Sequence, residues 1–351
     1  KSIAVIGPLA DAPRDTLGPW VFQQNNPPMT SILAAIKAKL GSSVRVDFAP
    51  GVTMPGRFNP SPFASITGTV VRPEPVGGDT TGIAEAVAKV KGADVAVLVL
   101  GEAQDMIGEL ASKSTLDLPG RQQELLDAVI ATGKPVVVLL MNGRPLDLHE
   151  AKATAILDVW YPGSAGGAAT ANLLFGDATP GGKLPFTWPR NVGQVPMIYA
   201  HLASHDPKGT NKRYWNETGG PAWPFGYGLS YSTFAYANLK IDKPGIAPGG
   251  SVTVTVDLRN TGTRTADDVA QLYIHQRSGT AARPVRELKG FRRVTLKPGE
   301  TRTLSFTLGD AELRYWNAVK RDWTIDDSVF DVAVGSDSTV TFGATFTVAR
   351  K

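Results

Sequence analysis

Short runs of Val, Ile and Leu alternate with longer segments of helical periodicity over the first 190 residues. The apolar runs are SIAVIG (2–7), VRVDFAP (44–50), DVAVLVLG (94–101), PVVVLLMNG (135–143), AILDVWY (155–161) and KLPFTWP (183–189). Segments 31–41, 82–93, 121–134 and 165–176 carry apolar residues three and four positions apart, as amphipathic helices do. Continuously apolar strands separated by helices are typical of a mainly parallel sheet covered on both faces. Residues 1–190 are therefore predicted to form an α/β layered sandwich domain.

The apolar period falls to two after residue 235. Stretches such as SVTVTVDLRNTG (251–262) and TRTLSFTLG (301–309) alternate β-branched or aromatic residues with polar ones between Gly, Asn and Pro turns. This pattern predicts an all-β, antiparallel sandwich of roughly seven strands over 236–351. Residues 191–235 are irregular and rich in Trp and Tyr, which predicts an aromatic linker with a functional or packing role.

Length and composition narrow the functional classes. A chain of 351 residues is expected to hold two domains. The formal charge is only +4 and no block of like charges occurs, so neither nucleic acid nor a membrane surface is an expected partner. The chain has no cysteine, which excludes disulfides, thiolate metal sites and a cysteine nucleophile. It starts inside a predicted strand without signal-peptide features, which suggests a processed or excised chain.

Several sites are not supported by the motifs. VIGPLAD follows the first strand but lacks GxGxxG, and no phosphate-binding GK[ST] occurs. The four histidines, His149, His201, His205 and His275, are too dispersed for a metal motif. Ser164 in YPGSAGG does not have the spacing of a nucleophile elbow, so we expect it to cap the following helix. No cofactor and no metal are predicted.

The loop after the predicted strand 94–101 carries three carboxylates within eight residues. Glu102 stands at the end of the strand, where a carboxylate accepts bonds from loop amides, so a structural role is expected for it. Glu109 stands mid-loop beside Gly108 and can project into a shared cleft. From the residues alone, a catalytic role for Glu109 and a simple solvated acidic loop, which also holds Asp105, both remain open.

Five motifs carry a resemblance to a known family. In order along the chain they are SIAVIGPLADAPRDTLGPW, ADVAVLVLGEAQDMIGE, TGKPVVVLLMNGRPL, VWYPGSAGGAATANLLFGDATPGGKLPFTWPRNVGQVP and WPFGYGLSYSTF. Together they resemble the C-terminal half of a glycoside hydrolase family 3 enzyme of the bacterial periplasmic β-glucosidase type. The final sandwich is similar to the fibronectin type III-like domain of many members.

The resemblance implies a glycosidase mechanism shared between domains. It implies the acid/base half of a retaining, exo-acting β-glucosidase that hydrolyses terminal non-reducing β-D-glucosyl residues. The family acid/base position falls on Glu109, and the nucleophilic Asp belongs to an N-terminal (β/α)8 barrel. The implied partners are that barrel, as a separate or cleaved chain, and an oligosaccharide or aryl β-glucoside. The implied location is periplasmic or secreted.

The sequence also departs from the family pattern. The barrel is missing, so this chain by itself is not expected to complete the reaction. Relatives often carry an Arg and an Asp at the positions of Lys113 and Thr115. We predict substrate-binding roles for Met106, as apolar shielding, and for Lys113. A β-xylosidase or N-acetylglucosaminidase of the same family and a non-catalytic carbohydrate-binding module remain the alternatives.

Overall fold

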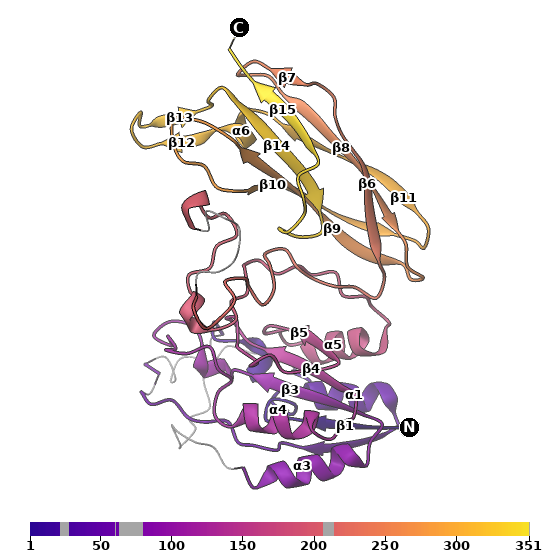
Figure 1. Ribbon diagram of the computed structural model, residues 1–351. Helices are drawn as coiled ribbons and strands as arrows, with labels where there is room; N and C mark the ends of the chain where they lie inside the picture. Colours follow the sequence, from indigo (N-terminus) through magenta and orange to yellow (C-terminus); the bar gives the residue numbers. More distant parts are fainter. Residues whose placement is uncertain (22–27, 60, 63–79, 206–213, 351) are drawn as a thin grey trace. The chain divides into compact units, whose positions relative to one another are not determined.

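The computed structural model of the chain describes residues 1–21, 28–59, 61–62, 80–205 and 214–350 (Figure 1). Contacts between residues divide the chain into two compact units, Lys1–Ala178 and Thr179–Lys351. The three-part division predicted at residues 190 and 235 stays a prediction.

A five-stranded parallel sheet forms the centre of the first unit. Its strands are β1 (Ser2–Ile6), β2 (Arg45–Ala49), β3 (Val95–Gly101), β4 (Val136–Met141) and β5 (Ala155–Asp158). They are arranged in the order β2-β1-β3-β4-β5, and every neighbouring pair is parallel. The apolar runs of β3 and β4 are almost entirely buried because they lie inside the sheet, between other strands. The predicted α/β fold class is confirmed.

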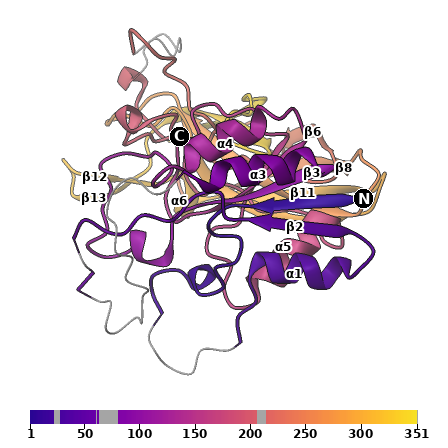
Figure 2. The same ribbon diagram turned by 90° about the horizontal axis from the view of Figure 1, so that it is seen from below.

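Helices cover both faces of this sheet. The α-helices described in the first unit are α1 (Ile32–Leu40), α3 (Gly82–Lys91), α4 (Gln122–Ile130) and α5 (Gly166–Phe175). Figure 2 shows α1 and α5 on one face and α3 and α4 on the other. On the α1 face, Ile32 and Ile36, four residues apart, pack into one buried cluster with Val5, Val97 and Leu139. The helical spacing in the sequence therefore marks the side that faces the sheet.

The N-termini of helices α1 and α5 are capped in different ways. Ser31 caps α1, because its Oγ accepts a hydrogen bond of 3.1 Å from the amide of Ala34. The cap predicted for Ser164 is wrong: α5 begins at Gly166 with Ala165 in the cap position and no side-chain cap bond. The amide of Gly166 bonds instead to the carbonyl of Gly163, so a backbone turn satisfies it.

The strand predicted at 183–189 does not form. Pro185 and Pro189 lack the N–H that a sheet ladder needs, and the segment belongs to the second unit. Trp188 makes an isolated bridge to Trp223, whose carbonyl accepts from the Trp188 amide at 2.9 Å. A single bridge replaces the expected strand.

The second unit is a β-sandwich. Its strands are β6 (Phe234–Ile241), β7 (Gly245–Ile246), β8 (Val252–Asn260), β9 (Ala266–Gln276), β10 (Glu287–Leu296), β11 (Thr301–Leu308), β14 (Ser328–Gly335) and β15 (Ala344–Val348), with the hairpin β12 (Tyr315–Asn317) and β13 (Asp322–Thr324) and the short helix α6 (Asp310–Leu313). Among the described residues, the sheets have the orders β10-β9-β14-β15-β7 and β11-β8-β6. All pairs are antiparallel except β15 with the two-residue β7.

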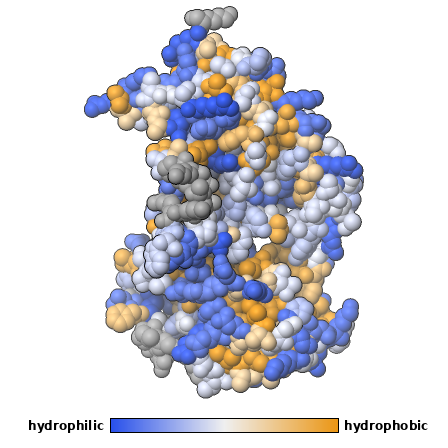
Figure 3. Space-filling model, in the orientation of Figure 1, coloured by the Kyte–Doolittle hydropathy of each residue, from blue (hydrophilic) through white to orange (hydrophobic). Residues whose placement is uncertain are grey.

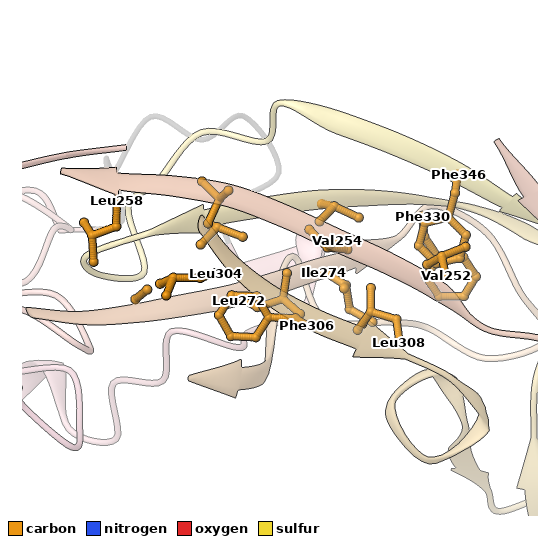
Figure 4. Packing of buried hydrophobic residues seen from close by; sticks show 14 of the residues in the cluster. Val252, Val254, Leu258, Leu272, Ile274, Leu304, Phe306, Leu308, Phe330 and Phe346 are labelled. Carbon is orange, nitrogen blue, oxygen red and sulfur yellow. The ribbon is translucent and has the colours of Figure 1, made fainter. Parts of the chain in front are cut away.

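Alternate residues of the facing strands form the sandwich core. Figure 4 shows Val252, Val254 and Leu258 of β8 pointing toward side chains of β9, β11, β14 and β15. Phe330 and Phe346 stack with ring centroids 5.3 Å apart. The period of two in the sequence thus corresponds to one buried face on each strand.

Aromatic residues of the irregular segment pack within the second unit. Between residues 191 and 233 the described chain forms only two short 3-10 helices, Val192–Gln194 and Ala203–His205. Tyr199 stacks on Phe225 at 4.2 Å between ring centroids and meets Tyr273 of β9 edge-on at 6.0 Å. These contacts fix a long loop that has little regular structure of its own.

The surface of both units is of mixed polarity. Figure 3 shows hydrophilic and hydrophobic residues interspersed over the face drawn. In the part of the chain that the structure describes, every helix is too short or too polar to cross a membrane.

Candidate active site

The loops that follow β1 and β3 lie where the strand order of the parallel sheet reverses. From β1 the chain passes to β2 on one side, and from β3 it passes to β4 on the other. The carboxyl ends of strands at such a switch point are the usual place for ligands in open α/β sheets. The two loops also touch: the amide of Gln104 donates to Asp15 Oδ1 at 2.8 Å, and Gln104 Nε2 donates to the Gly18 carbonyl at 2.6 Å.

Glycine is required where β3 ends and the carboxylate-bearing loop begins. Gly101 has φ = 130°, and a Cβ built on it would lie 1.8 Å from the carbonyl oxygen of Met141 on β4. No other residue fits there without moving the strand. The position of the loop is therefore set by the close approach of the two strands.

Glu102 is buried directly after this glycine. Its side chain is 0 % exposed and forms an ion pair with Arg144, with 3.1 Å between Nε and Oε1. Burial raises the pKa of the Glu102 carboxyl, while the charges of Arg144 and Lys113 act in the opposite direction. Glu102 thus provides the counter-charge of an arginine beneath the loop.

Arg144 connects Glu102 to the backbone around Glu109. Its Nη2 donates to the carbonyl of Met106 at 2.9 Å and to the carbonyl of Ala111 at 2.8 Å. These two carbonyls lie on either side of Glu109 in the sequence. Arg144 therefore fixes both ends of the six-residue stretch that contains the predicted acid/base.

A second arginine holds the same stretch. Arg57 donates from Nη1 to the carbonyl of Asp105 at 3.1 Å and from Nη2 to the carbonyl of Leu110 at 2.6 Å. Arg144 lies in the motif TGKPVVVLLMNGRPL and Arg57 lies outside the five motifs, but they are 38 and 48 residues from their first acceptors, and the motif predicts no contact for Arg144. Sequence reasoning missed both.

Glu109 itself is exposed. The preceding Gly108 has φ = 97°, and a Cβ there would lie 2.9 Å from the Cβ of Pro19, whereas the following Leu110 has φ = 57° and is 68 % exposed. A solvent-facing carboxylate on a stretch whose backbone is fixed on both sides can exchange a proton with a bound molecule without rearrangement of the loop.

Met106 and Lys113 lie closer to the protein interior. Met106 is half-buried against the core of the first unit. Lys113 is half-buried, and its Nζ donates to the carbonyl of Asp117. Burial lowers the pKa of the Lys113 ammonium, and Glu102 raises it. The substrate-binding roles of both residues stay predictions.

Trp20 is a neighbour of this loop that sequence reasoning did not single out. Its side chain is 65 % exposed, and its Cζ2 would lie 3.8 Å from a Cβ on Gly108. An exposed indole ring beside the residue that precedes Glu109 is suited to stacking on a sugar ring. The only signal in the sequence is the tripeptide GPW, 89 residues upstream of Glu109.

Asp158, the last residue of β5, is a carboxyl at the same edge of the sheet. Its Oδ1 accepts from the amide of Trp160 at 3.2 Å, while its buried Oδ2 has no hydrogen-bond partner among the described residues. Burial raises the pKa of Asp158 to about 7. The carboxyl therefore holds its proton more tightly than an exposed aspartate does.

Three potential metal ligands meet between the loops after β3 and β4. Asp117, Asp147 and His149 each offer an atom within 4.8 Å of the others. Oxygen and imidazole ligands suit several divalent cations. His149 Nε2 already lies 3.1 Å from Asp117 Oδ1, and the amide of Asp147 donates to the Leu116 carbonyl at 2.8 Å. Mutual contacts that join the two loops account for the group.

Comparison with known proteins identifies the family. Residues 1–231 match the Glycosyl hydrolase family 3 C-terminal domain, and residues 268–338 match the Fibronectin type III-like domain. The chain belongs to glycosyl hydrolase family 3. The resemblance inferred from the five motifs is confirmed, and so is the order of an α/β domain followed by a fibronectin type III-like sandwich.

Relatives in family 3 are longer than this chain. The Periplasmic beta-glucosidase of Salmonella typhimurium is 40 % identical over 345 residues, which are 96 % of this chain and 45 % of the relative. The Beta-xylosidase of Formosa agariphila is 38 % identical, with coverage of 96 % and 44 %. A crystal structure of a β-glucosidase from Listeria innocua in complex with glucose has a TM-score of 0.82 at 29 % identity, covering 99 % of this chain and 46 % of that one. The chain spans about half the length of the relatives it matches.

Proposed function

We propose that this chain supplies the acid/base residue, Glu109, of a retaining, exo-acting β-glucosidase. The observation that carries the proposal is the exposed carboxylate of Glu109 on a stretch held by Arg57 and Arg144. An N-terminal (β/α)8 barrel would supply the nucleophilic Asp. Half-length coverage of family 3 β-glucosidases supports the need for such a partner.

Two carboxyl groups are needed because cleavage passes through an oxocarbenium-like transition state. One carboxylate attacks the anomeric carbon, and the acid protonates the leaving oxygen as that bond breaks. The resulting carboxylate then removes a proton from water, which attacks the glycosyl-enzyme and releases the sugar with retained configuration. Retention requires about 5 to 5.5 Å between the two carboxyl groups. Glu109 must therefore be held in place, which the two arginines do through the backbone.

Neighbouring side chains have supporting roles in this proposal. The exposed ring of Trp20 stacks on the sugar or its leaving group. Lys113 contributes positive charge beneath the loop, and Met106 contributes apolar surface near the acid/base. Glu102 acts through Arg144 as a positioning residue rather than by contact with substrate.

The substitution Glu109→Gln in the complete enzyme, in which this chain is joined to its barrel, tests the acid/base role. We expect kcat/KM for phenyl β-glucoside to fall by about 10²- to 10⁴-fold, because its poor leaving group needs protonation. The activated 2,4-dinitrophenyl β-glucoside should lose less than about tenfold in the glycosylation step. Azide should restore turnover of Glu109→Ala and yield β-glucosyl azide, since azide attacks without a general base.

The control is Glu85→Gln, which removes another exposed carboxylate from the same unit. It should leave both substrates unaffected. Equal losses on phenyl and dinitrophenyl glucosides in Glu109→Gln would disprove the acid/base role.

A β-xylosidase is the second candidate, favoured by the Formosa agariphila relative at 38 % identity. Xylose lacks the hydroxymethyl group of glucose, and a pocket that fits one sugar discriminates against the other by about 10- to 200-fold. Comparison of kcat/KM for the 4-nitrophenyl β-glucoside, β-xyloside and N-acetyl-β-glucosaminide decides among them. Polysaccharide binding by the chain without any turnover by the complete protein would favour a carbohydrate-binding module.

The partner and the location form part of the same proposal. The Salmonella typhimurium relative is named as periplasmic, which supports a periplasmic or secreted location. A denaturing gel with intact mass on protein purified from its source tests the barrel partner. A second species of barrel size, about 250 residues or more, would indicate a cleaved or separate chain, whereas a single longer species would indicate one continuous enzyme.

A further inference from the structure

A cavity of about 340 Å³ lies within the second unit, in residues that the proposed glycosidase chemistry does not use. Its walls come from the irregular segment, including Met197 and Tyr199, and from two segments of the β-sandwich, which contribute Arg286 and Ser338. This volume is at the lower end of the range for small-molecule sites. The cavity is thus large enough for a compact organic molecule.

The cavity wall carries a guanidinium and two imidazole rings, but no carboxylate among its described residues. Arg286, His201 and His205 contribute to it, and no Asp or Glu is among the described lining residues. The imidazole rings of His201 and His205 lie 4.7 Å apart between centroids. His201 Nδ1 lies 3.0 Å from the Leu202 carbonyl, so Nδ1 carries a hydrogen and donates it to that oxygen. Arg286 supplies the positive charge of the wall, and with no carboxylate among the described lining residues the wall favours an anion over a cation.

Arg286 has aromatic rings and one carbonyl beside its charge, but no carboxylate partner among the described residues. Its Nη1 donates to the Val340 carbonyl at 2.9 Å, and within the described residues no carboxylate lies within 4.0 Å of its guanidinium. Burial lowers its pKa, while Tyr273 and the more distant Asp337 raise it. The carboxylate of Asp337 accepts two hydrogen bonds from Thr339, at 2.8 Å from the amide and 2.6 Å from Oγ1. A partly desolvated guanidinium thus lies in the cavity wall without an ion-pair partner.

The remaining walls are apolar and aromatic. Met197, Pro224 and Val285 contribute aliphatic surface. The ring of Tyr199 is held by its stack on Phe225, and its hydroxyl accepts from a backbone amide of β10. A flat apolar group would pack here, with its charged end at the guanidinium.

We propose that this cavity binds an aryl carboxylate, with the carboxylate on Arg286 and the ring against the apolar wall. A guanidinium offers a planar pair of donors that matches a carboxylate, and the bond is strongest where water is excluded. The apolar wall favours an aryl carboxylate over an inorganic anion, because an inorganic anion would leave that surface exposed to water. The site is independent of Glu109 and of the sugar specificity.

Cinnamate is the probe, titrated calorimetrically into the 351-residue chain. We expect a dissociation constant of about 1 mM or tighter, as suits a ligand of this size. Cinnamyl alcohol has the same ring and no charge, so it should bind at least about tenfold more weakly. Inorganic phosphate has charge without a ring and should also bind at least about tenfold more weakly.

Arg286→Gln tests the residue, because it removes the guanidinium and its charge while it keeps a polar side chain at the position. It should weaken cinnamate binding at least about tenfold. The matched control, Arg292→Gln, removes an exposed arginine from β10 of the same unit and should change binding less than about twofold. Circular dichroism of each variant verifies folding.

Three results with cinnamate and its alcohol, and a fourth with phosphate, would overturn the proposal. The first three are the absence of cinnamate binding by the folded chain up to about 10 mM, equal affinity for cinnamate and cinnamyl alcohol, and unchanged affinity in Arg286→Gln. Phosphate binding as tight as cinnamate would also overturn it, because the site would then recognise charge alone. The comparison of the two probes on the unaltered chain does not depend on whether a variant folds.

Discussion

Arg144 in the first unit and Arg286 in the second are both removed from most of the solvent, yet they are surrounded very differently. Arg144 forms an ion pair with the buried Glu102 and donates to two loop carbonyls. Arg286 donates to one carbonyl and lines a cavity. Its Cζ lies 5.0 Å from the ring centroid of Phe342 and 5.9 Å from that of Tyr273.

The difference separates two uses of the same side chain. Where the protein supplies acceptors for a buried guanidinium, removal leaves other groups unpaired, so the residue stabilises and positions its surroundings. Where the protein leaves the charge without a partner, the fold gains little from it and a ligand can gain much. The structural surroundings of an arginine therefore indicate whether to expect a loss of stability or a loss of binding.

The largest expected effect in the chain is on stability, from Arg144→Gln. The substitution leaves the buried Glu102 without its counter-charge, and loss of one partner from a buried ion pair costs about 3 to 5 kcal/mol. Urea unfolding followed by circular dichroism measures the change. The matched control is Arg121→Gln, which breaks an exposed pair with Glu124 and should cost less than about 1 kcal/mol.

A double substitution locates the cause of that loss. If the unpaired charge dominates, Glu102→Gln combined with Arg144→Gln should destabilise the chain less than the sum of the two single changes. If the two losses of unfolding free energy are strictly additive, Arg144 stabilises the chain through the loop carbonyls and not through the ion pair.

The loop that Arg144 holds should respond next most strongly to a change at Gly108. Gly108→Ala places a Cβ at φ = 97° and 2.9 Å from the Cβ of Pro19, which should cost about 1 to 3 kcal/mol and displace Glu109. In the complete enzyme, kcat should fall more than affinity for a substrate analogue.

Gly133→Ala is the control for backbone strain. Gly133 also has positive φ, 72°, but a Cβ there has nothing within 4 Å. It should lose stability without any change in kcat. A similar kcat for both variants would mean that the backbone next to Glu109 does not set its position.

The sequence predicts the elements of both units better than the contacts between their loops. The runs of β3 and β4 and the alternation in β8 are continuous in the chain, so their period identifies the buried face. The strand predicted at 183–189 does not form, because the prediction gave more weight to the apolar residues than to the two prolines, which prevent a ladder of hydrogen bonds.

The candidate site was predictable only where a motif is local. Glu109 was identified from the loop and the family resemblance, but Arg57 and Arg144 act through backbone carbonyls, which any residue provides. Such contacts leave no pattern in the residues contacted. The cavity around Arg286 is similar, since its walls come from three separate parts of the sequence, within 187–224, at 285–286 and at 338–339.

Asp158 extends the comparison to a carboxyl whose partner is missing. Its pKa is raised to about 7 by burial, so folding favours the protonated form. The associated stability is fully present below the unfolded pKa, near 3.8, and is lost as the pH rises through about 7. Thermal midpoints measured from pH 5 to 8 should therefore fall less in Asp158→Asn than in the unaltered chain.

Asp257→Asn is the opposite case and serves as the control. Hydrogen bonds from Asn238 and Thr303 lower the pKa of Asp257, so its contribution is present above the unfolded pKa and is lost as the pH falls through the folded value. Its removal should leave the pH 5 to 8 profile unchanged. An identical slope in Asp158→Asn and the unaltered chain would refute the burial of an unpaired carboxyl.

The smallest expected change in stability is that of Arg286→Gln, and it is the sharpest contrast with Arg144→Gln. The substitution removes one donor to the carbonyl of the half-buried Val340, which water can replace, and no carboxylate in the described residues loses an ion pair. The free energy of unfolding should therefore change by about 1 kcal/mol or less, because the lost contacts with aromatic rings are offset by relief of desolvation. Urea unfolding of the two variants side by side measures the difference. A loss of about 3 kcal/mol or more for Arg286→Gln would place this residue with Arg144 among the positioning arginines. Arg286 would then maintain the shape of the cavity and would not be available to bind a ligand.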